Sequence, residues 1–144
     1  MTELEDAFRV QQLVARFANS FDTKAWDALG ACLSSDVYTD YSDLRGTPPE
    51  TMSRERFVEL RRTALEPLKT HHLAGNVEIR LDGARGVAVV SMVIHRRSAA
   101  DEVFDTHCLY ELGVEKTAQE WAIHSIVQKV LWSSGQSAIH RGAR

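Results

Sequence analysis

The apolar positions in the first third of the chain recur at helical spacing. The intervals are four, three and four residues, between Val10, Val14, Phe17 and Phe21. This spacing predicts an amphipathic helix from about Glu3 to Ser20. A shorter helix is expected to follow, marked by Trp26, Leu29 and Leu33 and ended by residues 34–36. Asp22 or Thr23 can cap the N-terminus of this second helix.

The pattern between residues 37 and 70 is mixed. Residues 37–41 are typical of a short strand, and residues 46–49 of a loop. Ser53 can cap a third helix, which Pro67 should end. The apolar face of this helix comprises Phe57, Leu60, Ala64 and Leu65. The side chains expected in solvent are Arg54, Glu55, Arg61 and Arg62.

After Thr70 the period changes from helical to extended. Strands are expected at about residues 72–81, 85–97, 103–114 and 120–132. Their short connections predict an antiparallel meander. Helices followed by a curved antiparallel sheet make one α+β domain spanning residues 1–144. Residues 133–144 show no apolar period and are expected to be mobile or folded over the mouth of the sheet.

The strand at residues 85–97 is apolar on both faces. One face carries Val87, Val89 and Val93, and the other carries Val90, Met92 and Ile94. A strand buried on both sides needs helices against one face and a second cover, such as another subunit, against the other. We therefore expect a homo-oligomer, either a dimer or a trimer.

Composition and charge restrict the class of protein. The 144 residues are 44% hydrophobic and 26% charged, with a net charge of −3, as in an ordinary globular domain. This balance gives no electrostatic reason to bind nucleic acid or an anionic membrane. The acidic start speaks against a targeting peptide, and no apolar run approaches the roughly 20 residues of a membrane span. Cys32 and Cys108 lack metal-site spacing, so we expect reduced cysteines and a cytoplasmic location.

Several polar groups are candidates for chemistry: Asp22, Tyr41, His71, His72, His95 and His107. Each also has an ordinary structural interpretation, because an aspartate can cap a helix and a half-buried tyrosine or histidine is common on a strand. His95 shares a strand face with Val87, Val89, Ser91 and Val93. If that face is the interior, an imidazole lies where burial is costly without a partner. Polar groups converging on an apolar interior are what a small-molecule pocket requires.

The strand that starts near His72 raises a question of register. Plain alternation would place His71 on the face of Val77 and Ile79. A bulge at Gly75–Asn76 would reset the alternation, so that His72 faces inward instead. We predict this bulge, with His71 as the alternative.

A family resemblance rests on several short motifs. Residues 21–29 (Phe-Asp-Thr-Lys-Ala-Trp-Asp-Ala-Leu), followed by Asp40-Tyr41, resemble the scytalone dehydratase branch of the SnoaL-like superfamily. Residues 70–75, residues 93–96 and Trp121 continue the similarity in the same order. It covers roughly residues 3–132 and implies a cone-shaped α+β fold of a curved sheet wrapped around N-terminal helices.

The resemblance also implies roles for individual residues. Asp22 and His72 match an aspartate–histidine base, His95 a second histidine, and Tyr41 one of two tyrosines that polarise a substrate carbonyl. The second tyrosine position holds Phe21, which cannot donate a hydrogen bond. The residues expected to line the substrate are Phe21, Trp26, Ser91, His107 and Leu109. No organic cofactor or metal is needed for the implied reaction.

Three functions fit these residues. The first is a cofactor-independent dehydratase of a small cyclic or aromatic hydroxy-ketone, in which His72 is the base, Asp22 orients it and Tyr41 binds the oxyanion. The second is an isomerase or polyketide cyclase that moves protons without losing water. The third is a non-catalytic ligand carrier or dimerisation module.

Two further patterns have simple interpretations. A zinc site of His72, His95 and His107 is disfavoured, because no metal-type spacing joins them. The pairs Arg61-Arg62 and Arg96-Arg97 are expected to be solvated surface.

Overall fold

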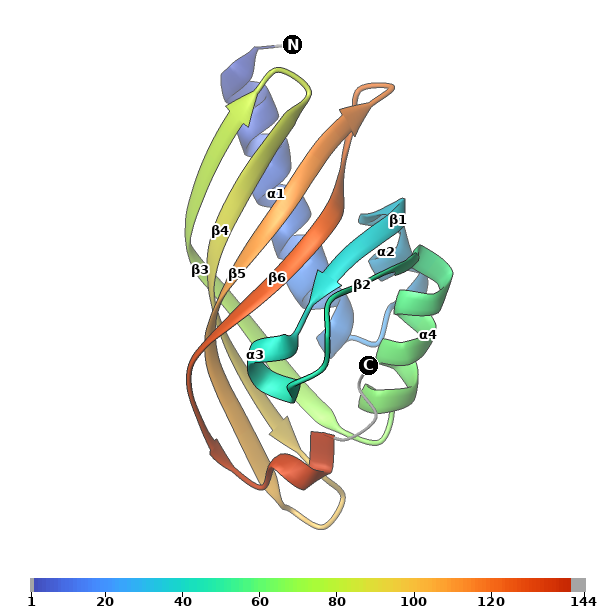
Figure 1. The fold of residues 1–144 in the computed structure, drawn as a ribbon, viewed down its shortest axis with the longest axis vertical. Coiled ribbons are helices and arrows are strands. Elements are labelled where there is room, and N and C mark those ends of the chain that lie inside the picture. Colours follow the sequence, from blue (N-terminus) through green and yellow to red (C-terminus); the bar gives the residue numbers. More distant parts are fainter. Residues whose placement is uncertain (1, 141–144) are drawn as a thin grey trace.

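Helices from the first half of the chain lie against one curved sheet, whose four long strands all follow residue 68 (Figure 1). The computed structural model describes residues 2–140. Within them the elements are α1 (Glu3–Asp22), α2 (Trp26–Ala31), β1 (Leu33–Asp40), α3 (Ser42–Arg45), β2 (Glu50–Ser53), α4 (Arg54–Leu65), β3 (Lys69–Asp82), β4 (Arg85–Arg97), β5 (Val103–Thr117), β6 (Glu120–Gly135) and the 3₁₀ helix η1 (Ser137–His140). The strands stand in the order β2-β1-β6-β5-β4-β3. Neighbouring strands are antiparallel, except that β1 runs parallel to β6. The predicted α+β class is confirmed.

The first helix begins at a capping box. The Thr2 hydroxyl accepts a hydrogen bond from the backbone N–H of Glu5, and the Glu5 carboxylate accepts one from the N–H of Thr2. The helix runs two residues beyond its expected end, to Asp22, and the left-handed Lys24 follows it (φ 54°). The expected caps of α2 are wrong, because Ala25 occupies the N-cap position without a side-chain hydrogen bond.

Two other differences concern the middle of the chain. Residues 34–36 do not end α2 but belong to β1, where Leu33 is buried and pairs with Ile123. Ser53 caps α4 as predicted, by accepting from the N–H of Arg56. Arg61 was expected in solvent, but it is only 5% exposed.

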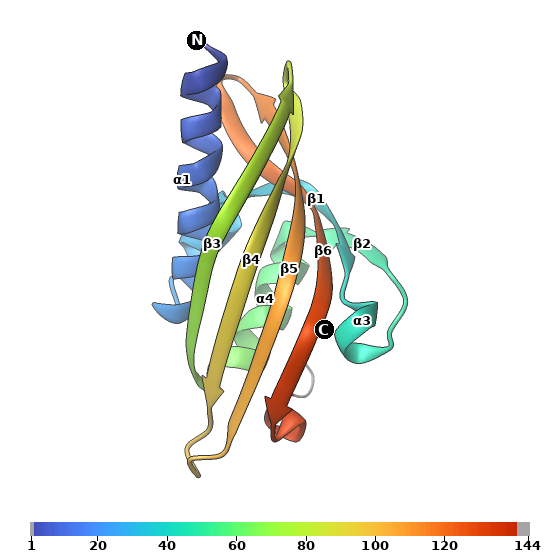
Figure 2. The same ribbon diagram turned by 90° about the vertical axis from the view of Figure 1, so that its left-hand side faces the viewer.

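The two faces of the sheet are sharply different in β4. The concave face, toward the helices, carries Ala88, Val90, Met92 and Ile94, each at most 1% exposed. The outer face, which Figure 2 shows with α4 behind the sheet, carries the partly exposed Val87 and Val89. His95 therefore lies on the outer face of this strand, and the face that carries Ile94 is the interior.

Three remaining expectations concern the bulge, the cysteines and the tail. The register of β3 against β4 shifts between Gly75 and Glu78, and Asn76 has φ 47°, so the predicted bulge is confirmed. Cys32 and Cys108 are both buried and free. Residues 133–135 continue β6 and residues 137–140 form η1, while residues 141–144 lie outside the described part. No helix in residues 2–140 is long and apolar enough to cross a membrane.

Candidate active site

A carboxylate and an imidazole meet where α1 ends and β3 begins. Asp22 Oδ1 lies 2.7 Å from His72 Nδ1, and Asp22 Oδ2 accepts a 2.7 Å hydrogen bond from the backbone N–H of His72. The hydroxyl of Thr70 also donates to Asp22 Oδ1, at 2.9 Å. Three donors therefore fix both oxygens of one carboxylate, which holds the imidazole in a single orientation.

Local backbone geometry explains why these two residues meet. Asp22 is the last residue of α1, whose apolar stripe is buried in the core. His72 lies before the β3 bulge and faces inward opposite Ile94 of β4, while His71 is exposed. Residues an odd number of positions apart ordinarily face opposite sides of a strand. The bulge between His72 and Val77 shifts this alternation, so that His72 shares the inner face with Val77 and Ile79. Of the two histidines, His72 is therefore the one that faces the interior.

Burial determines the protonation state of His72. Its side chain is 7% exposed, and burial lowers its pKa, with the hydrogen bond and charge of Asp22 acting in the opposite direction. The imidazole is therefore neutral at pH 7. Because a carboxylate can only accept, Nδ1 carries the proton and Nε2 keeps a free lone pair. The ring of Phe21 stacks on the imidazole with centroids 4.7 Å apart.

The pair borders a small interior pocket between the sheet and α4. Its free volume is about 20 Å³, little more than one water molecule occupies. The side chains around it are Phe21, Tyr41, Arg45, Arg61, Leu65, His72, Ile94, Arg96, Tyr110, Gln128 and His140. The pocket therefore combines an apolar wall with an unusual number of polar and cationic groups.

Two tyrosines line this pocket. The rings of Tyr41 and Tyr110 lie 6.5 Å apart, edge to face. Burial raises the pKa of Tyr41 and raises that of Tyr110 well above its ordinary value, so both hydroxyls keep their protons at neutral pH. Gln128 Nε2 donates to Tyr110 Oη at 3.1 Å. Phe21 leaves one tyrosine position unfilled, but Tyr110 brings a second phenol from another strand.

Four of the expected site residues do not reach this pocket, because they lie on the outer face of the sheet. His95 pairs across the strands with Asp105, with Nδ1 and Oδ1 3.1 Å apart, and its side chain is 53% exposed. His107 stacks on the ring of Trp132 with centroids 4.2 Å apart. Ser91 and Leu109 pair with each other on the same outer face. Placing these four residues in the interior was wrong, because either face of β4 is apolar enough to be buried.

Trp26 is also outside the pocket. It begins α2, where its indole N–H donates to Glu66 Oε2 at 3.2 Å. The structure therefore brings together Asp22, His72, Tyr41 and Phe21 out of the residues predicted from the sequence. His72, on the inner face, and His95 and His107, on the outer face, cannot share a metal ion. Within residues 2–140 no group of three or more His, Cys, Asp or Glu side chains is placed to hold one.

Sequence reasoning missed the arginines of the pocket. Arg61 and Arg96 were expected on the surface, yet they are 5% and 3% exposed. Both lie in phase with apolar neighbours: Arg61 is one helical turn from Phe57, and Arg96 follows Ile94 on the inner face of β4. Their positions in the apolar pattern were a usable signal.

The tail supplies the last wall of the pocket. His140 is 8% exposed, and its ring lies 6.3 Å from that of Phe104. Its backbone carbonyl accepts from Arg45 Nη1 at 3.4 Å, and its Nε2 contacts Arg45 Nη2. Burial lowers the pKa of His140, and the charges of Arg96 and Arg45 lower it further. No sequence pattern predicted this position, because the segment has no apolar period.

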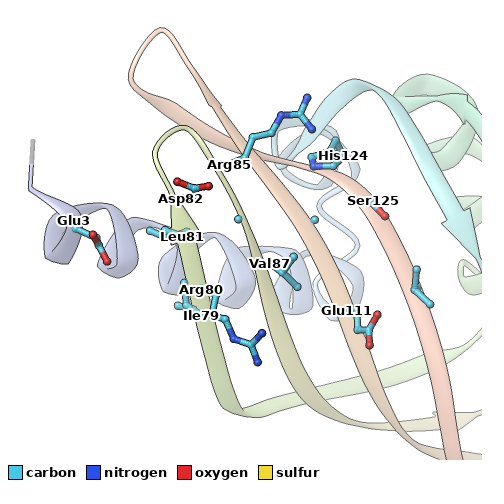
Figure 3. A pocket seen from close by; sticks show the side chains of 13 residues that line it. Glu3, Ile79, Arg80, Leu81, Asp82, Arg85, Val87, Glu111, His124 and Ser125 are labelled. Carbon is cyan, nitrogen blue, oxygen red and sulfur yellow. The ribbon is translucent and has the colours of Figure 1, made fainter.

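A larger hollow lies elsewhere on the molecule. Figure 3 shows Val87, Glu111 and His124, from β4, β5 and β6, around it. It holds about 790 Å³ but shares no lining residue with the pocket of His72. The Asp22–His72 pair makes the small interior pocket the candidate active site.

Comparison with known proteins agrees with this fold. Residues 2–127 match the family described as the SnoaL-like domain, and the chain belongs to that family. Over 76 residues the chain is 36% identical to the scytalone dehydratase-like protein claB of Passalora fulva. That alignment covers 53% of this chain and 43% of claB, so the chain matches less than half of the length of this relative.

Solved structures share the architecture over nearly the whole chain. The Kfla4162 protein from Kribbella flavida superposes with a TM-score of 0.92 at 17% identity, covering 97% of this chain and 99% of the other. The hexachlorocyclohexane dehydrochlorinase LinA-type3 from Novosphingobium barchaimii gives a TM-score of 0.79 at 12% identity, covering 95% and 94%. At these identities the similarity establishes the cone-shaped fold.

Proposed function

We propose that the chain is a cofactor-independent lyase that removes water from a small cyclic or aromatic hydroxy-ketone. The observation that carries this proposal is the Asp22–His72 contact beside a pocket with two protonated tyrosines. The similarity to a scytalone dehydratase-like protein supports the same reaction class. A neutral imidazole held by a carboxylate is a suitable base near neutral pH.

The reaction needs a base, an oxyanion donor and an acid. His72 Nε2 takes the proton on the carbon next to the carbonyl, and Asp22 stabilises the imidazolium that forms. The electron pair of that C–H bond moves onto the carbonyl oxygen, where Tyr41, with Tyr110, donates a hydrogen bond to the enolate. As the carbonyl re-forms, the electrons make the C=C bond and the C–O bond breaks. The departing hydroxide takes the proton back from His72 and leaves as water.

The second histidine of the family has no part in this assignment. His95 matches that histidine, but its position on the outer face excludes direct contact with a substrate in this pocket. His72 can perform both proton transfers when the hydrogen and the hydroxyl leave from the same face of the substrate. Phe21, stacked on the imidazole, would pack against the substrate ring.

Two competing functions make different predictions. An isomerase or cyclase would use the same base and phenols but would conserve the mass of its substrate. A non-catalytic module explains the small free volume of the pocket, but it gives no reason for Asp22 to bind an imidazole instead of capping a helix. The paired base favours catalysis.

The test is a screen of phenolic and polyketide-like hydroxy-ketones by mass spectrometry. We expect a product lighter by one water, and loss of its formation in His72→Ala, with His71→Ala as the matched control on the exposed neighbour. A product of unchanged mass would replace the lyase by an isomerase or cyclase. Unaltered turnover in His72→Ala would refute the assignment of the base.

We also propose that the outer face of the sheet joins copies of the chain in a cytoplasmic homo-oligomer, a dimer or trimer. This face exposes Val87 and Trp132, at 45% and 58%. An apolar surface of this kind is unusual on a monomer. Gel filtration at micromolar concentration should give a multiple of the chain mass, and a monomer would contradict association.

A further inference from the structure

Three arginines bring positive charge into the candidate active site. Arg45, Arg61 and Arg96 come from α3, α4 and β4, elements that are distant in the sequence, and all line the pocket of His72. Among the described residues that line this pocket there is no aspartate or glutamate. Asp22, behind His72, is engaged by the imidazole, a backbone N–H and Thr70. The described lining residues therefore include three arginines and no carboxylate.

The surroundings of Arg96 are the clearest sign of a missing partner. Its side chain is buried, Nη1 donates to the Thr106 hydroxyl at 3.2 Å, and the guanidinium lies 5.0 Å from the centroid of the Phe104 ring. Its buried Nε has no acceptor among residues 2–140. A buried charged donor without an acceptor is costly, because it has lost its hydration. Neighbouring Asp105 cannot supply an acceptor from the outer face, where it pairs with His95.

Arg45 is in a similar position. Its Nε is also buried without an acceptor among the described residues, and its contacts to the pocket are with the His140 carbonyl and ring and with the face of Tyr41. Arg61 adds a third charge, with its guanidinium 4.5 Å from the centroid of Tyr41. Burial, together with the charge of Arg61, lowers the pKa of Arg45 and of Arg96 to about 10. Arg45 and Arg96 therefore remain protonated at neutral pH.

We propose that the pocket binds an anionic ligand, and that the substrate carries a carboxylate held by Arg96 and Arg45 with Arg61 beside them. A planar carboxylate fits the paired donors of a guanidinium, and it supplies a negative charge that no described lining residue carries. The inference rests on the proposed function for the identity of the pocket as the active site. It narrows the hydroxy-ketone to one with an acid group.

The carboxylate would also position the substrate. Arg96 stands two residues from Ile94, which pairs across the strands with His72, so anion and base share one wall of the pocket. An anchored acid group leaves the remainder of the ligand between the imidazole and the two phenols. The His140 carbonyl, which accepts from Arg45, is the group that the bound anion would displace.

The test compares binding of benzoate with that of benzamide, its uncharged analogue of equal size, by calorimetry and by the NMR signal of Arg96 Nε–H. We expect benzoate to bind roughly tenfold tighter or more and to shift that signal. Arg96→Met should abolish the preference, whereas Arg97→Met, the exposed neighbour, should keep it. Because no ion pair of Arg96 is present among the described residues, Arg96→Met leaves no opposite charge buried and unpaired there, and we expect the variant to fold.

The outcomes separate this inference from the proposed function. Equal affinity for the two probes, or no benzoate binding at millimolar concentration, overturns the inference. If the preference for benzoate over benzamide survives in Arg96→Met and in Arg45→Met, these arginines have a purely structural role. That result also overturns the inference. Asp22→Asn and His72→Ala should keep the preference for benzoate. Turnover measured in these two variants therefore tests the catalytic proposal alone, and their binding of benzoate tests the anion site alone.

Discussion

Asp22 and His72 are 50 residues apart in the sequence, yet their side chains are joined by a 2.7 Å contact in the interior of the cone. The carboxylate comes from the end of a helix and the imidazole from the start of a strand, so the contact also fastens α1 to β3. One interaction therefore serves the fold and the candidate chemistry.

Asp22→Asn should lower kcat by roughly 10²- to 10⁴-fold. An amide of the same size can donate as well as accept, so it no longer fixes the proton on Nδ1 or stabilises the imidazolium. Steady-state kinetics on a substrate that the enzyme dehydrates would measure this loss of kcat. Asp27→Asn, an exposed change on α2, is the matched control. An Asp22→Asn enzyme of normal kcat would mean that the pair is only structural.

The pH dependence should follow His72. Because burial lowers its pKa in the folded state, the unfolded chain takes up protons first as the pH falls below the ordinary value of about 6.5. The free energy of unfolding is therefore highest above pH 6.5 and declines toward the lowered pKa. His140, whose pKa burial also lowers, adds to the decline.

Urea unfolding across this pH range would measure the effect. His140→Ala should flatten the acid side of the stability curve. In the same range kcat/KM should fall only below the lowered pKa of His72, because the base must be neutral. An activity that halves at or above pH 6.5 would contradict a buried, neutral base.

The two phenols should contribute separately to catalysis. Tyr41→Phe and Tyr110→Phe each remove one hydroxyl that faces the pocket, and we expect kcat to fall by about 10²- to 10³-fold for the one that binds the oxyanion. Tyr38→Phe, on the partly exposed Tyr38 of β1, controls for loss of a phenol elsewhere. If both pocket variants kept the kcat of the wild type, the tyrosines would have no part in the mechanism.

His95→Ala should leave kcat and KM within about twofold of wild type, since surface changes distant from a site have small effects. Its imidazole faces Asp105 on the outer side of the sheet and cannot touch a ligand held by Arg96. The same kinetic assay applies. A loss comparable to that of His72→Ala would show that the inner and outer faces of β4 are wrongly assigned.

His140→Ala should lower KM for an anionic substrate several-fold. The wild-type pocket is free only over about 20 Å³ and its Arg45 is already in contact with His140, so a substrate must displace this side chain in order to bind. Ser137→Ala, exposed on the same 3₁₀ turn, is the control. An increase in KM would instead identify His140 as a substrate contact.

The sequence predicted the architecture well because helical and alternating periods are strong in α1, α4 and the long strands. The family resemblance implied the Asp22–His72 pair, and the bulge predicted from the alternation of β3 placed His72 on the inner face. Sequence reasoning failed on β4, where Val89 and Val93 on one face are as apolar as Val90 and Ile94 on the other. The neighbouring strand β5 indicates which face of β4 is the inner one. Its apolar face is buried and pairs with the inner residues of β4; it consists of Phe104, Cys108, Tyr110 and Leu112.

The arginines were missed for a different reason. Charged side chains were assigned to solvent by type, although Arg61 and Arg96 stand in phase with buried neighbours. Position in the period was the better guide than residue type. For Arg45 and His140, which lie in a short helix and a terminal turn, no period exists, and only the tertiary fold places them.

The alternation in β4 makes its length critical. Met92, Ile94 and Arg96 line the interior, and the residues between them form the outside wall. Inserting or deleting one residue before Met92 would exchange the two surfaces, turning the guanidinium outward and an imidazole inward. A shift of one residue in this strand would therefore remove Arg96 from the pocket without changing any side chain that follows it.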